Sequence, residues 1–161
     1  MTALVPMTIK GLMLDPVSNS PIVVLKDDAD KVYLPIWVGI FEANAIALQL
    51  ENIETPRPMT HDLLKNFIGE LQARVHRVVI NDLRESTFYA QIHVVSGGRA
   101  FEVDARPSDA IALALRTAAP IFVAQSVLDQ AQTIALDEDS GDKLKKWFDD
   151  ISPEDLGKYK M

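Results

Sequence analysis

Cysteine is absent from the 161-residue sequence. This absence excludes disulfide bonds, zinc sites built on thiolates and thiol nucleophiles, so any bound metal must be held by carboxylate or imidazole groups. Long apolar runs are also missing, because no uninterrupted stretch reaches the roughly 18 residues that a membrane-spanning helix needs. Residues 1–10 lack the basic segment and apolar core of a secretory signal. We therefore expect a cytoplasmic protein with no membrane partner.

Positive charge is scarce as well. The chain has 16 Lys and Arg residues against 23 Asp and Glu residues, which gives a net charge of −7 and a pI near 4.9. This balance argues against a protein that binds nucleic acid by overall charge alone, so a polyanionic partner would need a local basic site. Hydrophobic residues make up 48% of the chain, which is enough to bury a core in one domain of ordinary size.

Strand-forming and helix-forming segments follow one another in a regular order. Apolar and β-branched residues between turn formers predict strands, and apolar residues at helical spacing predict helices. Pro35 interrupts the third strand, which indicates an edge or a bulge there. The predicted strands are Met7–Leu14, Pro21–Leu25, Val32–Val38, Arg74–Leu83, Thr87–Val95, Arg99–Ala105 and Ile121–Ala124. The predicted helices are Phe41–Leu50, a helix with Thr60 as its N-cap and the apolar residues Leu63, Leu64, Phe67 and Leu71, and Pro107–Ala118.

A short repeat indicates an internal duplication. Residues 45–48 read Ala-Ile-Ala-Leu, residues 110–113 repeat this sequence, and each run follows three predicted strands. Two β-β-β-α units would build a mixed, mainly antiparallel sheet with helices packed on it, which is an α+β fold. The two units are not chemically equivalent, because Asn44 stands where the second unit has Asp109. A chance recurrence of alanine-rich helices remains the alternative.

The domain is expected to cover residues 1–136. Residues 137–161 form a mostly acidic appendage, in which Lys143–Ile151 has the pattern of a short amphipathic helix. The small apolar residues of the first helix, with Trp37 and Phe41 beside them, exceed what one small core needs. We therefore predict a homodimer or a larger closed oligomer.

The segment Asp104–Asp109 runs from a strand end into a helix start, where unpaired N–H groups attract anions. Arg106 has the geometry to hold a phosphate with two hydrogen bonds, and carboxylates such as Asp104 and Asp109 suit a divalent cation or a water. A simpler interpretation is open as well. Ser108 or Asp109 would then only cap the helix, and Arg106 would pair with Asp104.

The segment Arg57–Asp62 repeats this arrangement, with an arginine just before a helix start and His61 in the first turn. Histidine titrates near neutral pH and suits proton transfer. The alternative is a capped helix with an exposed imidazole. Glu42, in the first turn of the first helix, would either add a carboxylate to a shared site or only favour the helix dipole.

Three stretches together resemble one known family. They are Leu34–Gly39 with Glu42 and Ala43, Arg57–Leu64, and Asp104–Leu113. In this order they are similar to the bifunctional nuclease family, with a match that spans about Met7 to Gln125. The resemblance implies DNase and RNase activity, with DNA and RNA as substrates and hydrolysis of phosphodiester bonds as the reaction.

This resemblance leads to predicted roles for the motif residues. Phosphodiester hydrolysis requires an activated water, stabilisation of charge on the phosphate and help for the leaving oxygen. Two alternatives compete: a non-enzymatic module that oligomerises or binds a small phosphorylated ligand, and hydrolysis of a small phosphoester. The predicted catalytic residues are His61 as general base or acid, Asp62 to orient it, and Glu42. Mg²⁺ or Mn²⁺ is predicted to bind at Glu42, Asp104 and Asp109. The phosphate is predicted to bind at Arg57, Arg106 and Ser108.

Overall fold

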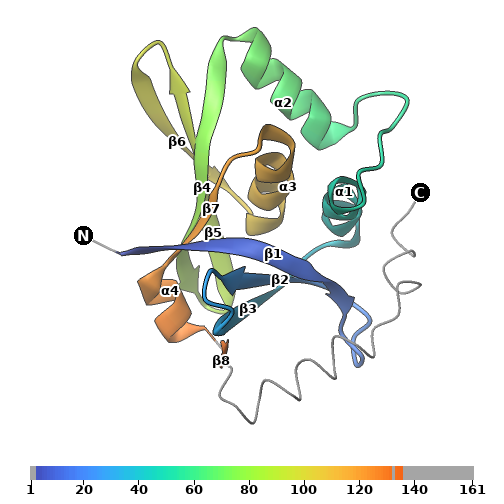
Figure 1. Cartoon of the computed structure of the whole chain (residues 1–161), viewed down its shortest axis with the longest axis vertical. Helices are drawn as coiled ribbons and strands as arrows, with labels where there is room; N and C mark the ends of the chain where they lie inside the picture. Colours follow the sequence, from blue (N-terminus) through green and yellow to red (C-terminus); the bar gives the residue numbers. More distant parts are fainter. Residues whose placement is uncertain (1–2, 132, 136–161) are drawn as a thin grey trace.

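A computed structural model describes residues 3–131 and 133–135 of the chain. A strongly twisted sheet carries helices on its faces (Figure 1). The predicted acidic appendage 137–161, with its helix at Lys143–Ile151, lies outside the described residues. The elements are β1 Leu4–Leu14, β2 Pro21–Asp27, β3 Val32–Trp37, α1 Ile40–Leu50, α2 Thr60–Glu70, β4 Ala73–Arg84, β5 Thr87–Ser96, β6 Arg99–Ala105, α3 Pro107–Thr117, β7 Ile121–Ala124, α4 Gln125–Gln130 and β8 Ile134–Ala135.

The strands of the described residues form one sheet in the order β6-β5-β4-β7-β1-β2-β3-β8. Every neighbouring pair is antiparallel except β4 and β7, which run parallel. Each predicted β-β-β-α unit is a three-stranded meander followed by a helix, and β7 joins the two meanders. The predicted α+β class with a mixed, mainly antiparallel sheet is therefore confirmed.

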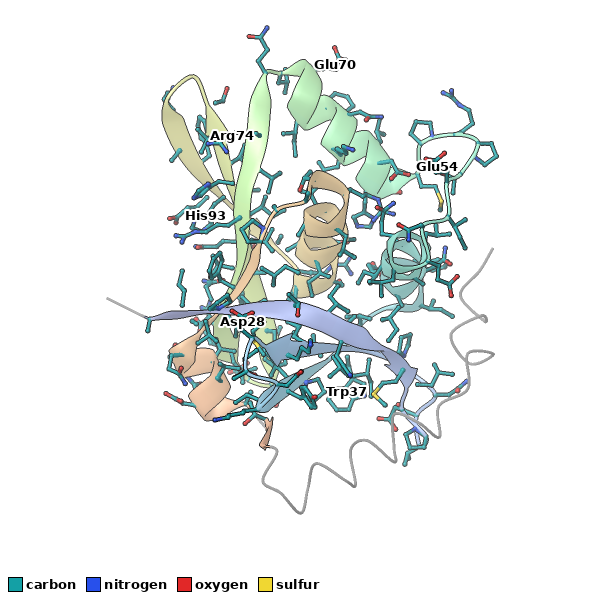
Figure 2. The ribbon with its side chains drawn as sticks, in the orientation of Figure 1. Asp28, Trp37, Glu54, Glu70, Arg74 and His93 are labelled. Atoms are coloured by element: carbon teal, nitrogen blue, oxygen red, sulfur yellow. The ribbon has the colours of Figure 1, made fainter. Side chains whose placement is uncertain are left out.

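The helices pack close together over the sheet. In the first meander α1 contacts β2, and in the second α3 contacts β4 and β5, while α3 also packs against both α1 and α2. Alanines on α1 and α3 allow this close approach, and Ile46, Ile111 and Leu113 are fully buried between the helices and the sheet. Figure 2 shows side chains filling the space between the layers, and it places His93 on the side of the sheet away from α3. No helix of the described residues is long and apolar enough to cross a bilayer.

Two local expectations need adjustment. Thr60 is not the N-cap of α2: Met59 occupies that position, Thr60 is the first helical residue, and the Met59 N–H donates to Asp62 Oδ2 at 2.9 Å. Pro35 is opposite Val24 of β2, whereas β8 pairs only with Val32 and Tyr33. Pro35 thus has no strand beside it on its other side among the described residues, as its missing N–H predicts.

A buried arginine ties the helices to one another. Arg116 of α3 is 8% exposed. Its Nη1 donates to the carbonyl of Ala112, its Nη2 donates to the carbonyl of Ala45 in α1 at 3.0 Å, and its Nε donates to Asp62 Oδ1 of α2 at 2.7 Å. The guanidinium therefore exchanges its water shell for acceptors on three helices, which fixes where α2 begins.

We expect Arg116→Met to lower the free energy of unfolding by about 3–5 kcal/mol, because the substitution leaves Asp62 part-buried without its cation. The double variant with Asp62→Asn should cost less than the sum of the two single substitutions. Urea denaturation of the four proteins measures the coupling. Arg84→Met serves as a control, since Arg84 pairs with Asp82 at the surface and should contribute about 1 kcal/mol or less; an equal cost for both arginines would contradict this account.

Candidate functional site

Three helices begin close together, and each carries an acidic residue at its third position. Glu42 holds that position in α1, Asp62 in α2 and Asp109 in α3. Unpaired N–H groups and the helix dipole favour negative charge in a first turn. Helix physics alone explains why acids are found here, so the contacts of each carboxylate must show what more it does.

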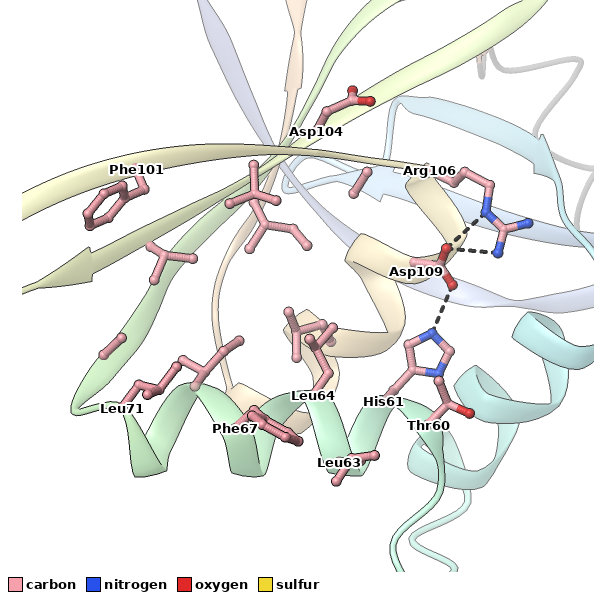
Figure 3. A pocket seen from close by; sticks show the side chains of 17 residues that line it. Thr60, His61, Leu63, Leu64, Phe67, Leu71, Phe101, Asp104, Arg106 and Asp109 are labelled. Carbon is pink, nitrogen blue, oxygen red and sulfur yellow. Dashed lines mark hydrogen bonds and ion pairs between the residues drawn. The ribbon is translucent and has the colours of Figure 1, made fainter.

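Asp109 shares its two oxygens between a histidine and an arginine. Its Oδ1 lies 2.9 Å from Nε2 of His61, and its Oδ2 accepts from Nε of Arg106 at 2.9 Å (Figure 3). Nη2 of Arg106 reaches the same Oδ2 at 2.8 Å and Glu42 Oε1 at 2.5 Å. These contacts join all three motifs of the sequence. The simpler interpretation of Asp109 as a cap is not what the structure shows, because its carboxylate binds side chains.

The members of this chain of contacts differ in exposure. His61 is 9% exposed, whereas the Arg106 side chain is 65% exposed. The hydrogen bonds that Arg106 donates to Asp109 and Glu42 raise its pKa above the usual value, so the guanidinium is charged at any working pH. No contact joins Nη1 of Arg106 to another described residue. The arginine therefore keeps one donor edge toward the solvent.

Asp62 does not orient His61, although it is the next residue in the chain. Its two oxygens bind the Met59 N–H and the Arg116 guanidinium. Burial acts to raise the pKa of Asp62, but the Met59 N–H and Arg116 outweigh burial, so this pKa is lowered from its ordinary value. The orienting partner of His61 is Asp109, and Asp62 instead fixes the start of the helix that carries His61.

Gly39 has a reason to be glycine. It is the N-cap of α1, and a Cβ at this position would collide with the Glu42 carboxylate, which folds back over it. The backbone of Gly39 is in an ordinary extended conformation, so the constraint is space and not strain. The absent side chain lets Glu42 reach Arg106.

Two hollows meet at this group. The apolar groove has a volume of about 830 Å³ and lies between α2 and strands β5 and β6. The polar pocket, about 310 Å³, lies at the starts of α1 and α2, and both hollows are lined by His61, Arg106 and Asp109. Asn44 lines the polar pocket and is 5% exposed, yet its Oδ1 has no hydrogen-bond partner. The apolar lining of the groove includes Leu64, Phe67, Leu71, Val94, Phe101 and Val103.

Three predicted site residues take no part in these hydrogen bonds, although Asp104 lines the apolar groove and Ser108 shares a third pocket with Arg106. Asp104 projects from β6 away from the His61–Asp109 pair (Figure 3). Ser108 is 6% exposed and lines a different pocket, beside Trp37 and Gly39. Arg57 is exposed on the loop before α2, where its carbonyl accepts from the Thr55 hydroxyl, and no contact joins it to His61 or Asp109.

The predicted metal ligands do not form a cation site in this arrangement. Within residues 3–131 and 133–135, no group of three or more His, Asp or Glu side chains is placed to hold a metal. Asp104 points elsewhere, and the Arg106 guanidinium fills the space between Glu42 and Asp109 where a cation would bind. Mg²⁺ typically uses one or two carboxylates with waters and phosphate oxygens. Glu42 and Asp109 would match that set only with Arg106 displaced.

Sequence reasoning missed Arg116 and Asn44 as parts of the site. Arg116 lies four residues after Ala112 and seven after Asp109, which puts a charged residue on the helix face that carries small and apolar side chains. A buried charge needs a partner, so this spacing was a usable signal. The repeat places Asn44 at the position of Asp109, but no sequence pattern indicated that its Oδ1 is buried without a hydrogen-bond partner.

Comparison with known proteins places the chain. The model of the bifunctional nuclease domain matches residues 23–135, well over half of the sequence. The chain belongs to the bifunctional nuclease domain family. The matched region begins inside β2 and includes α4 and β8, so it starts and ends later than the expected span from Met7 to Gln125. All three motifs lie within it.

Individual relatives fall into two groups. An uncharacterized protein of Mycobacterium tuberculosis is 40% identical over 157 residues, which cover 91% of this chain and 94% of that protein. Bifunctional nuclease 1 of Oryza sativa subsp. japonica is 29% identical over 68% of this chain, and Bifunctional nuclease 1 of Arabidopsis thaliana is 30% identical over 64% of it. The match covers only about a third of each plant protein, 34% and 33%.

The lowered pKa of Asp62 gives a testable pH dependence. A carboxyl whose pKa is lower in the folded than in the unfolded chain stabilises the fold above the unfolded value of about 3.9, and this contribution is lost as the pH falls through the folded value. We therefore expect the wild type to lose more free energy of unfolding than Asp62→Asn between about pH 5 and about pH 3. Parallel acid profiles by urea denaturation would refute the assignment.

Proposed function

We propose that this protein is a nuclease that hydrolyses phosphodiester bonds of DNA and RNA at the His61–Asp109–Arg106 group. Two independent facts support the proposal. The chain belongs to the bifunctional nuclease domain family, and its plant relatives carry the name bifunctional nuclease. The motifs that identify the family are also the segments whose side chains meet in the structure.

The contact between His61 and Asp109 carries the proposal. With Asp109 ionised, Nε2 of His61 carries the ring proton and donates a hydrogen bond to Oδ1 of Asp109. The second ring nitrogen, Nδ1, then keeps a lone pair. A base held by a carboxylate in one tautomer is the arrangement that general-base catalysis uses. In the proposed reaction Nδ1 accepts a proton from the attacking water as the oxygen bonds to phosphorus and the bond to the leaving oxygen breaks, and the leaving oxygen takes a proton from the solvent.

Arg106 supplies the phosphate contact through its free Nη1 edge. Its position above the first turn of α3 also places the phosphate near the unpaired N–H groups of that helix. The local charge sets a limit, because Glu42 and Asp109 already offset the guanidinium. We therefore expect weak substrate binding and slow cleavage, in keeping with the net charge of −7.

The decisive test is Asp109→Asn. Asparagine keeps the volume of aspartate, but its amide no longer holds the His61 tautomer by charge, so cleavage of single-stranded DNA or RNA should fall by about 100-fold or more. The melting temperature should change little, since the ion pair that Asp109 makes with the exposed Arg106 side chain is a surface contact, and such pairs contribute little to stability. Fluorescent oligonucleotide cleavage and circular dichroism measure the two effects.

The matched control is Asp28→Asn, an equal change of charge in the exposed turn before β3. This variant, purified in parallel, should cleave at the wild-type rate. Cleavage that survives in the Asp109→Asn protein would identify a contaminant or a different site. Absence of cleavage in the wild type over a range of metals and substrates would favour a binding module for a small phosphorylated ligand.

The sequence predicts that activity depends on Mg²⁺ or Mn²⁺. In the proposed site a bound ion would have to displace the Arg106 guanidinium. A divalent ion between Glu42 and Asp109 would take the place that the guanidinium fills, so the two cations compete. We expect Arg106→Gln to bind Mn²⁺ at least about tenfold more tightly than the wild type by calorimetry. The double variant with Glu42→Gln should lose this gain. Equal affinity of the wild type and Arg106→Gln would remove the predicted metal position.

A further inference from the structure

Strand β6 lies at the open edge of the sheet. Within the part of the chain that the structure describes, it pairs with β5 on one side and with no strand on the other. Every residue from Arg99 to Asp104 is exposed, and Phe101 and Val103 remain 42% and 48% exposed. β6 contains neither a proline nor a bulge that would block a further strand.

Apolar surface continues from this edge onto α2. Phe101 and Val103 form part of one wall of the apolar groove, and the helical stripe of Leu63, Phe67 and Leu71 is between 50% and 71% exposed. The sequence predicts this stripe, but it is only partly covered by the chain itself. A connected apolar surface of this kind is typical of a protein interface.

We propose that β6 pairs antiparallel with β6 of a second copy, around a two-fold axis at Phe101, and that the apolar surface beside it belongs to the same interface. A partner for this surface must offer an unpaired strand edge with apolar side chains next to it. The surface itself offers both, so a second copy satisfies it with closed symmetry.

The charges along β6 and the length of the pairing select the register, because an axis at Ala100 would pair only Arg99–Phe101 of each strand. A two-fold axis normal to the sheet keeps each side chain on its own face, so only residues of equal parity are paired. An axis at Glu102 would place two carboxylates opposite each other, and an axis at Val103 would pair Glu102 with Asp104. With the axis at Phe101, the two phenylalanines meet on the helix-bearing face and Glu102 faces Ala100 of the partner subunit.

This register has a consequence for the candidate site. It brings the Gly97–Gly98 turn of the partner subunit beside Asp104 and Ala105, at the end of β6 that leads to Arg106. The partner's Arg99 then lies opposite Val103 on the face that carries the apolar groove. The second copy would thus add a cation next to a site that has two carboxylates around one guanidinium in the single chain.

Because the chain has no cysteine, a single introduced thiol reports the register. Phe101→Cys should form a disulfide-linked dimer under mild oxidation, because directly opposed residues have Cα atoms about 4.5–5.5 Å apart. Glu102→Cys should not, because the two copies of residue 102 are offset by two residues along the strands and lie about 8 Å apart. Val17→Cys, 95% exposed in the turn after β1, controls for random collision. Non-reducing electrophoresis separates the outcomes.

Light scattering at about 50 µM tests the interface without a crosslink. The wild type should be a dimer, and Phe101→Glu should be a monomer with a nearly unchanged melting temperature, because Phe101 is already half exposed. Phe41→Glu, 77% exposed on α1, should remain a dimer. A monomeric wild type would overturn the proposal. Two other results would overturn it as well: dissociation of the dimer by Phe41→Glu, or a crosslink through Glu102→Cys without one through Phe101→Cys. None of these results depends on nuclease activity.

Discussion

The hydrogen bonds of Arg116 hold the three helices of the site to one another. One largely buried guanidinium binds the middle of α1, the first turn of α2 and its own helix α3. Asp62 passes this constraint to the first turn of α2, through its bond to the Met59 N–H. His61 lies in this turn, between Met59 and Asp62. Its position therefore depends on the contact between Asp62 and Arg116, which lies outside the His61–Asp109–Arg106 group.

The same type of residue performs two different tasks at equivalent positions. Asp62 and Asp109 both occupy the third position of a helix, where the dipole favours a carboxylate. Asp62 binds its own helix start and a structural arginine, whereas Asp109 binds a histidine and a solvent-exposed arginine. The difference lies in the partners that tertiary structure supplies. The position in the helix therefore explains why an acidic residue is present. Only its contacts explain what each carboxylate does.

The sequence predicted the order of the strands and helices from β1 to β7, since periodicity and turn residues are local signals, but it did not predict α4 or β8. It also predicted one site for Glu42, His61, Asp62, Arg106 and Asp109. Hydrogen bonds link four of these side chains, whereas Asp62 binds Met59 and Arg116. The partner of Asp62 and the direction of Asp104 escaped it, because both depend on how α3 and β6 are oriented in three dimensions. The exposed stripe of α2 was equally hidden, since apolar spacing reveals a face and not what covers it.

Strand β7 has a consequence for how the chain reaches its fold. It inserts between β4 and β1, so Ile121–Ala124 pair with residues about 40 positions earlier and with Leu4–Met7 at the other end of the sequence. Until residue 124 has left the ribosome, both meanders keep an open inner edge. Contacts of such long sequence separation slow folding, and they make the two repeats a single cooperative unit. A cut between the two β-β-β-α units would leave the N-terminal fragment without β7, and it would leave β7 of the C-terminal fragment without its partner β1. Neither unit therefore has a complete sheet by itself.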